Sequence, residues 1–289
     1  MAKIGFVGLG VMGYPMAGHL QTNGHDVTVF NRTTAKASRW AEQYGGKVGS
    51  TPAQAAQDAD VVVTIVGNDD DVRAVVEQDN GVLAAMAPGS VLVDHTTASA
   101  GLARSLYTQC DARGVGFVDA PVSGGESGAQ NGALTIMCGG DQRVFDSVAP
   151  VLDTYAVAVT RMGEAGSGQL TKMVNQICIA GLLQALSEGV HFAKLVGLDV
   201  DRVVEVISQG AAGSWQMANR GSTMAQGEFD FGFAVDWMRK DLGIALAEGD
   251  RAGASLAVTA MVDQFYSRIQ GRGGNRWDTS SLIDLLDRP

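Results

Sequence analysis

The sequence predicts an α/β fold in which a doubly wound parallel sheet is followed by an all-helical region. From the start of the chain to about residue 160, short apolar runs alternate with helix-like stretches, a pattern typical of βαβ crossovers. After Gly166, about thirty residues follow with apolar positions at helical spacing and no proline. We therefore expect two domains, residues 1–163 and residues 164–289, linked by a long helix.

Each expected element rests on a local signal. The predicted strands are short runs rich in β-branched residues, at 3–8, 26–30, 60–66, 90–96, 116–122, 133–140 and 156–162, with a weaker one at 46–49. The long helix runs from Ser167 to Gly197, where glycine favours a stop, and Asp199 is the expected N-cap of the next helix. Further helices are expected at 200–209, 215–225, 236–252 and 255–270, and Asp278 or Thr279 caps a last short one.

Composition and charge exclude several classes of function. The formal net charge of −10, with no basic stripe, argues against a nucleic-acid partner. No run approaches the ~20 apolar residues that a membrane span requires. The three cysteines are widely spaced, which predicts neither a metal site nor a disulfide framework and favours the reducing cytoplasm. The long helix is apolar around most of its circumference, so we also expect a homodimer or homotetramer.

The stretch "GLGVMG" follows the first predicted strand and precedes a helical segment. Gly8, Gly10 and Gly13 match G-x-G-x-x-G, in which the glycines permit a tight turn, close approach of a pyrophosphate and close helix–strand packing. The cofactor-binding loop thus comprises Gly8, Leu9, Gly10, Val11, Met12 and Gly13. The alternative is a purely structural glycine turn.

The second strand ends in Asn31-Arg32-Thr33, where a dinucleotide-binding protein usually places an acid for the adenosine ribose. Arg32 suits a 2′-phosphate and its neighbours can donate hydrogen bonds, so we expect NADP(H) to be preferred over NAD(H). The alternative is that Arg32 is merely solvated. Loops after the next strands should also face the ligand; these contain Gly67, Asn68, Thr96 and Thr97.

Two further stretches suit a small carboxylate substrate and its proton transfer. Ser123, Gly124 and Gly125 form either a nest of N–H donors for an oxyanion or an ordinary glycine turn. Lys172 lies near the positive end of the long helix with no acid at i±3 or i±4, which predicts a lowered pKa and general acid/base chemistry. The alternative is a surface lysine extended along the helix.

Asn175 and Gln176 lie within one turn of Lys172 on the same side of the predicted helix. Further along, Lys240 is placed to reach a cofactor phosphate or the substrate, or else belongs to a solvated face.

These motifs together resemble the β-hydroxyacid dehydrogenases, a family that includes 3-hydroxyisobutyrate dehydrogenase and tartronate semialdehyde reductase. The similarity rests on "GLGVMG", "DAPVSGG", "GSGQLTKMVNQ" and "FGFAVDWMRKDL", in this order along nearly the whole chain. It implies that Lys172 is the catalytic acid/base, that Ser123, Gly124 and Gly125 hold the substrate carboxylate, and that Asn175 and Gln176 orient the reacting oxygen. It also implies that Lys240 closes the site beside the cofactor.

One departure bears on the substrate: many members carry Asn-Asn where this chain has Asn175-Gln176. The expected activity is reversible hydride transfer between NADP(H) and a short β-hydroxy acid. Two rivals are imine or β-hydroxy amino acid turnover on the same scaffold and a non-catalytic NADP-binding sensor.

Overall fold

The computed structural model describes residues 1–287 and divides into two compact units. The first comprises Met1–Lys172 and the second begins at Met173. The division falls inside one continuous helix, whereas the sequence predicts a boundary after residue 163. No helix within residues 1–287 is long and apolar enough to cross a membrane.

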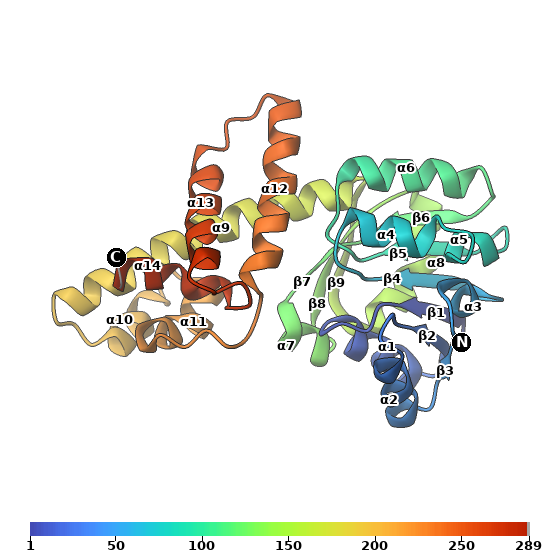
Figure 1. Cartoon of the computed structure of the whole chain (residues 1–289), viewed down its shortest axis with the longest axis horizontal. Helices are drawn as coiled ribbons and strands as arrows, with labels where there is room; N and C mark the ends of the chain where they lie inside the picture. The colour runs from blue at the N-terminus through green and yellow to red at the C-terminus, as the bar shows by residue number, and fades with distance from the viewer. Residues whose placement is uncertain (288–289) are drawn as a thin grey trace. The chain divides into compact units, whose positions relative to one another are not determined.

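The first unit is built on a nine-stranded sheet (Figure 1). Its strands are β1 (Lys3–Val7), β2 (Asp26–Phe30), β3 (Lys47–Val48), β4 (Val61–Thr64), β5 (Val91–Asp94), β6 (Gly116–Asp119), β7 (Val122–Ser123), β8 (Leu134–Gly139) and β9 (Ala156–Gly163). The order is β3-β2-β1-β4-β5-β6-β8-β7, with β9 paired to β8. Strands β1 to β6 are parallel, which confirms the doubly wound α/β prediction.

The expectation of one strand over residues 116–122 is wrong. β6 ends at Asp119, and β7 begins at Val122 and pairs antiparallel with β8. Pro121 lies between them and has no N–H for a ladder, which accounts for the break. The carbonyl of Pro121 still accepts a hydrogen bond from the Met137 N–H, at 3.1 Å.

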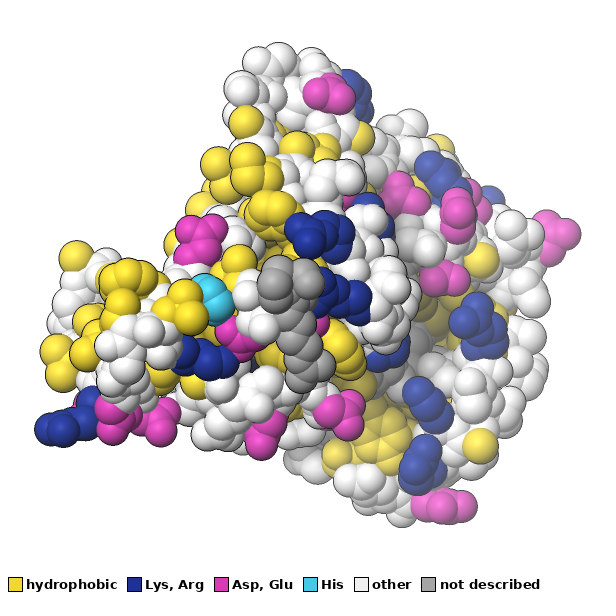
Figure 2. Space-filling view, turned by 60° about the vertical axis from the view of Figure 1, so that its left-hand side comes forward, with side chains coloured by type: hydrophobic (Ala, Val, Ile, Leu, Met, Phe, Trp, Pro, Cys, Tyr) yellow, Lys and Arg dark blue, Asp and Glu magenta, His cyan; other side chains and the backbone are white. Residues whose placement is uncertain are grey.

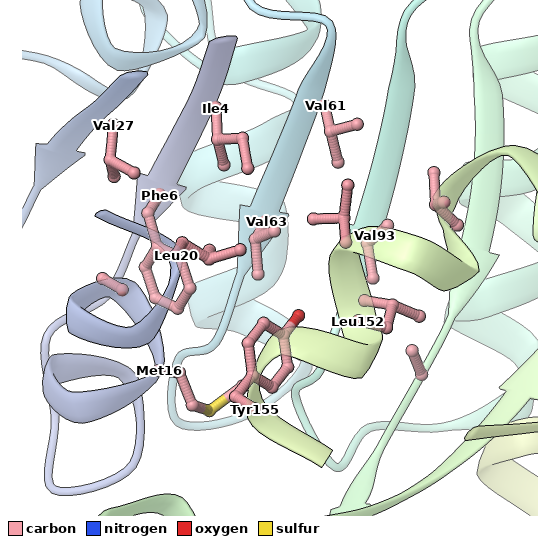
Figure 3. Close-up of a cluster of buried hydrophobic side chains, with 14 of the residues drawn as sticks. Ile4, Phe6, Met16, Leu20, Val27, Val61, Val63, Val93, Leu152 and Tyr155 are labelled. Carbon is pink, nitrogen blue, oxygen red and sulfur yellow. The ribbon is translucent and has the colours of Figure 1, made fainter. Parts of the chain in front are cut away.

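Helices cover both faces of this sheet. They are α1 (Gly13–Thr22), α2 (Thr34–Tyr44), α3 (Pro52–Ala56), α4 (Asp69–Val76), α5 (Val82–Ala85), α6 (Ala100–Asp111), α7 (Gly125–Gln130) and α8 (Gln142–Leu152), with a 3₁₀ turn at Asp153–Tyr155. Side chains of α1, α2 and α8 pack on one face, and Figure 3 shows Met16 and Leu20 of α1 against Phe6 and Val63 of the strands. Helices α3 to α6 bury a second cluster on the other face.

The parallel strands share one carboxyl edge, which fixes where a ligand site can form. In register across the sheet, the last paired residues are Phe30, Val7, Thr64, Asp94 and Asp119. The connections that follow these residues all leave the sheet along this row. This edge is the usual binding side of doubly wound sheets.

The second unit is all-helical among its described residues. Its helices are α9 (Ser167–Leu195, which begins in the first unit), α10 (Val200–Ile207), α11 (Trp215–Gln226), α12 (Val235–Ala252), α13 (Ala257–Gly271) and α14 (Asp284–Asp287), with a 3₁₀ segment at Thr279–Ile283. Gly197 takes a positive φ of 74° just after α9, and Asp199 caps α10 through the Arg202 N–H. Asp278 caps the 3₁₀ segment. These three predicted signals are confirmed.

Candidate active site

The three motif glycines of the loop between β1 and α1 differ in their surroundings. A Cβ added at Gly8 would lie 2.0 Å from the Ile65 carbonyl oxygen, and one at Gly13 would lie 2.0 Å from that of Gly8. Gly8 also has a positive φ of 106°. A Cβ at Gly10, by contrast, would meet nothing within 4 Å. Gly8 and Gly13 therefore let the backbone pack, and Gly10 leaves open space in front of a helix N-terminus, which fits a pyrophosphate.

Asn31 ties this loop to the end of β2. Its Oδ1 accepts a hydrogen bond from the Leu9 N–H at 2.9 Å, and its Nδ2 donates to the Thr33 carbonyl at 3.1 Å. The side chain of Leu9 is buried, whereas Val11 is exposed. Asn31 thus acts on the loop itself, in addition to the ligand contact expected of it.

Arg32 projects from the same strand end, and its side chain is 93% exposed. Its Nη1 lies 3.8 Å from Oδ1 of Asp71, in the first turn of α4. A carboxylate therefore stands beside the expected 2′-phosphate position, although none follows the strand directly. The acidic run Asp69–Asp71 is visible in the sequence. Its separation from Arg32 along the chain gives no indication that the two are in contact.

The loops after β4 and β5 lie against each other at the same edge. The Val66 N–H donates to Oγ1 of Thr96 at 3.0 Å, and Asn68 caps α4 by accepting from the Asp71 N–H at 2.9 Å. These contacts bring the neighbouring residues Gly67 and Thr97, both predicted to face the cofactor, to the edge that carries the glycine loop.

The Ser123-Gly124-Gly125 stretch joins the end of β7 to the start of α7. Gly124 has a φ of 129° and Gly125 a φ of 62°, both in the region that favours glycine. Helix α7, which follows, is bonded to α1: Nε2 of His19 lies 3.1 Å from the carbonyl oxygens of both Ala129 and Gln130. The predicted substrate turn and the glycine loop thus belong to one packed unit.

A buried carboxylate fixes the start of α9. Asp119, at the end of β6, accepts hydrogen bonds from the Gly166 N–H (2.7 Å, Oδ1) and the Gln169 N–H (2.9 Å, Oδ2). Burial raises the pKa of Asp119 to about 6, against the lowering effect of these N–H donors. Lys172 lies one turn beyond Gln169, and the residue is only 7% exposed.

Further buried polar groups next to Asp119 were not predicted from the sequence. Asp94 accepts from Oγ1 of Thr64 at 2.8 Å, and burial raises its pKa to about 6. His95 bonds the Ala120 carbonyl through Nδ1 (2.5 Å) and the Tyr155 hydroxyl through Nε2 (2.8 Å). Because burial lowers the pKa of His95 to about 4, its ring is neutral at pH 7. The Ala120 carbonyl only accepts, so Nδ1 is the donor and Nε2 accepts from Tyr155.

In the second unit, the predicted residues Asn175, Gln176 and Lys240 form one polar network with Asp241. Nδ2 of Asn175 donates to Oε1 of Gln176 at 2.8 Å, and Nε2 of Gln176 donates to Oδ2 of buried Asp241 at 2.7 Å. Nζ of Lys240 lies 3.0 Å from Oδ1 of Asp241. The Gln176 side chain thus links α9 to α12. The predicted roles of these residues toward a substrate stay predictions.

Comparisons with known proteins identify the family of the chain. Residues 3–163 match the model of the NAD-binding domain of 6-phosphogluconate dehydrogenase, and residues 166–286 match that of the NAD-binding region of NADP-dependent 3-hydroxyisobutyrate dehydrogenase. The chain belongs to the β-hydroxyacid dehydrogenase family. It is accordingly an oxidoreductase of the NAD(P)-dependent hydroxyacid dehydrogenase class.

Relatives of this dehydrogenase align over the whole chain. It is 61% identical to an uncharacterized oxidoreductase of Shewanella frigidimarina, with 100% of this chain and 99% of that protein covered. It is 33% identical to 2-hydroxy-3-oxopropionate reductase of Escherichia coli, with 99% and 97% covered. Among solved structures, 3-hydroxyisobutyrate dehydrogenase of Mycobacterium tuberculosis with L-serine is 31% identical, with a TM-score of 0.88 and complete coverage of both chains.

The different surroundings of the loop glycines give a prediction for cofactor binding. We expect Gly10→Ala to fold with a melting temperature near that of the wild type but to bind NADPH at least about tenfold more weakly, because its Cβ occupies only ligand space. Gly13→Ala should instead lower the melting temperature by several degrees, because its Cβ meets the Gly8 carbonyl. NADPH fluorescence titration and thermal unfolding of both variants test this, and equal behaviour of the two would contradict it.

Proposed function

We propose that the protein catalyses reversible hydride transfer between NADP(H) and a short β-hydroxy acid, with Lys172 as the general acid/base. The proposal rests on the placement of Lys172. Its buried side chain stands in the second turn of a helix whose start is hydrogen-bonded to Asp119, at the sheet edge that carries the glycine loop. A lysine merely extended along a solvated helix would not be buried in this way.

The cofactor would be held by the backbone around Gly10, by the N-terminus of α1 and, through its 2′-phosphate, by Arg32. When bound there, the nicotinamide cofactor supplies or accepts a hydride at C4 of its ring. Asp71 competes for Arg32 and must be displaced or neutralised by the incoming phosphate, so the preference for NADP(H) is set by a balance between these two side chains.

Lys172 moves the proton that accompanies the hydride. In the direction of reduction, its ammonium group donates a proton from Nζ to the carbonyl oxygen of the substrate, which becomes a hydroxyl. In the direction of oxidation, the neutral amine takes the hydroxyl proton.

The substrate carboxylate fits the turn at Ser123, Gly124 and Gly125, where backbone N–H groups and a hydroxyl are available as donors. The E. coli relative is named for reduction of 2-hydroxy-3-oxopropionate, and the M. tuberculosis structure is a 3-hydroxyisobutyrate dehydrogenase with L-serine. We therefore place the substrate among acids of three or four carbons with a β-hydroxyl or β-aldehyde group.

Lys172→Ala tests the proton transfer. We expect kcat to fall by about 10²- to 10⁴-fold, the usual contribution of a general acid/base, while NADPH affinity stays within about threefold. Initial rates should be measured with NADP⁺ and NAD⁺ on 3-hydroxyisobutyrate, glycerate, 3-hydroxypropionate, serine and threonate. Lys194→Ala, on the same helix, is the matched control and should retain the wild-type kcat.

Each other result of that panel, extended to reduction of imines with NADPH, has a defined meaning. A folded Lys172→Ala protein that keeps most of its turnover would disprove the acid/base assignment. Turnover of imines alone would point to an imine reductase. Tight NADPH binding without turnover of any acid or imine would support a non-catalytic sensor.

Arg32 and Asp71 give a prediction for cofactor choice. Removing a charge-assisted phosphate contact costs about 1.5–3 kcal/mol, so Arg32→Gln should raise the KM for NADP⁺ by roughly 10- to 100-fold and leave that for NAD⁺ nearly unchanged. Asp71→Asn should lower the KM for NADP⁺ several-fold, because the competing carboxylate is lost. Arg39→Gln, an exposed arginine of α2, is the control. An unchanged ratio of KM values in both variants would exclude this pair from cofactor choice.

We further propose that the second unit self-associates. Apolar side chains are exposed at the end of α9, in the turn that follows it and on α10; among them are Phe192, Leu195, Leu198 and Val206. Figure 2 shows hydrophobic side chains gathered on the surface of the second unit. Leu195 is 73% exposed. Light scattering should give a mass that is a multiple of 30.1 kDa, reduced by Leu195→Lys. A monomer at micromolar concentration would contradict this.

A further inference from the structure

The start of α9 contains a buried glutamine to which the proposed mechanism gives no role. Gln169 is almost fully buried, and both ends of its side-chain amide are engaged. Oε1 accepts from the Ala98 N–H at 3.0 Å, and Nε2 donates to the Thr96 carbonyl at 2.7 Å. These two partners flank Thr97, which is predicted to face the cofactor. The Gln169 side chain thus binds the backbone of the loop after β5 on both sides of Thr97.

The backbone of Gln169 is held as firmly as its side chain. Its N–H donates to Asp119 at the end of β6, at 2.9 Å. The preceding residue is a glycine whose added Cβ would lie 2.3 Å from the Met137 carbonyl oxygen, so the first turn of α9 lies directly on the sheet. Gln169 is therefore anchored to two strand ends at once.

Lys172 lies three residues beyond Gln169, which places the two side chains one above the other on the helix surface, about 4.5 Å apart along the axis. The Thr96–Ala98 loop is therefore connected to Lys172 through the Gln169 side chain and one turn of α9. A displacement of the loop relative to the helix would change the distance between Lys172 and a cofactor bound against the loop.

We propose that Gln169 is a positioning residue, which locks the Thr96–Ala98 loop to the first turn of α9 and so fixes Lys172 relative to the cofactor-facing loop. The inference rests on the proposed function, because it acts through Lys172. It also explains the residue type. A glutamate in this position would lack the donor for the Thr96 carbonyl, and a leucine would lack both groups while filling a similar space.

Gln169→Leu tests the role directly. A misplacement of about 1 Å between reacting groups can cost roughly 100-fold in rate, so we expect kcat to fall by about 10- to 100-fold while the KM for the acid changes little. The primary isotope effect with C4-deuterated NADPH should rise as the chemical step becomes rate-limiting. Gln184→Leu makes the same chemical change further along α9, where the amide bonds Glu188, and should match the wild type.

Hydrogen exchange provides a readout that needs no activity. In Gln169→Leu the Ala98 amide loses its acceptor, so its exchange should accelerate at least tenfold, whereas strand amides should keep their protection. If Gln169→Leu does not fold, Gln169→Met removes the same two hydrogen bonds with a more adaptable side chain and is measured in its place.

Combining the change with Lys172→Ala separates positioning from general destabilisation. A residue that acts only through Lys172 costs nothing further in kcat once that lysine is absent, whereas an independent structural effect adds to the loss. Additive losses, or wild-type kcat in Gln169→Leu, would overturn the inference. Wild-type turnover in Lys172→Ala itself would instead overturn the proposed function, so the two failures are distinguishable.

Discussion

The arrangement of the candidate site depends on the hydrogen bonds that the Asp119 carboxylate accepts at the start of α9. A long helix joined to a sheet only through a flexible turn would leave Lys172 without a fixed position. Here each carboxylate oxygen accepts a backbone N–H, at Gly166 and Gln169, and the negative charge lies at the positive end of the helix. These contacts offset part of the cost of burying the group, and the raised pKa shows that burial still dominates.

The loops that are predicted to face the cofactor lie at the same edge of the sheet. Strands β2, β1, β4, β5 and β6 are parallel, so the loops that follow them emerge side by side. Hydrogen bonds then hold these loops in place. Asn31 binds the glycine loop, Thr96 binds the loop after β4, and Gln169 binds the loop after β5. Each contact is buried or partly buried, so the loops are ordered by the fold before any ligand arrives, which lowers the entropic cost of binding.

Periodicity and glycine chemistry predicted the elements well, because these are local properties of the chain. The glycine loop, the strands, the stop at Gly197 and the cap at Asp199 all depend on residues within one turn or strand. The contacts between Arg32 and Asp71 and between Gln176 and Asp241 join residues far apart in sequence, and no spacing rule indicates them. The strand break before β7 differs from the prediction, because the apolar run of residues 116–122 favours one strand whereas Pro121 within it lacks the N–H that a ladder requires.

A structure of the protein crystallised with NADP⁺ and the acid that it turns over would show directly whether Lys172 is the general acid/base. The distance to measure joins Nζ of Lys172 to the β-hydroxyl oxygen of the acid. We expect hydrogen-bond contact, about 2.6–3.2 Å, with the substrate carboxylate on the turn at Ser123. A reacting hydroxyl bound by another titratable side chain, with Lys172 directed elsewhere, would contradict it.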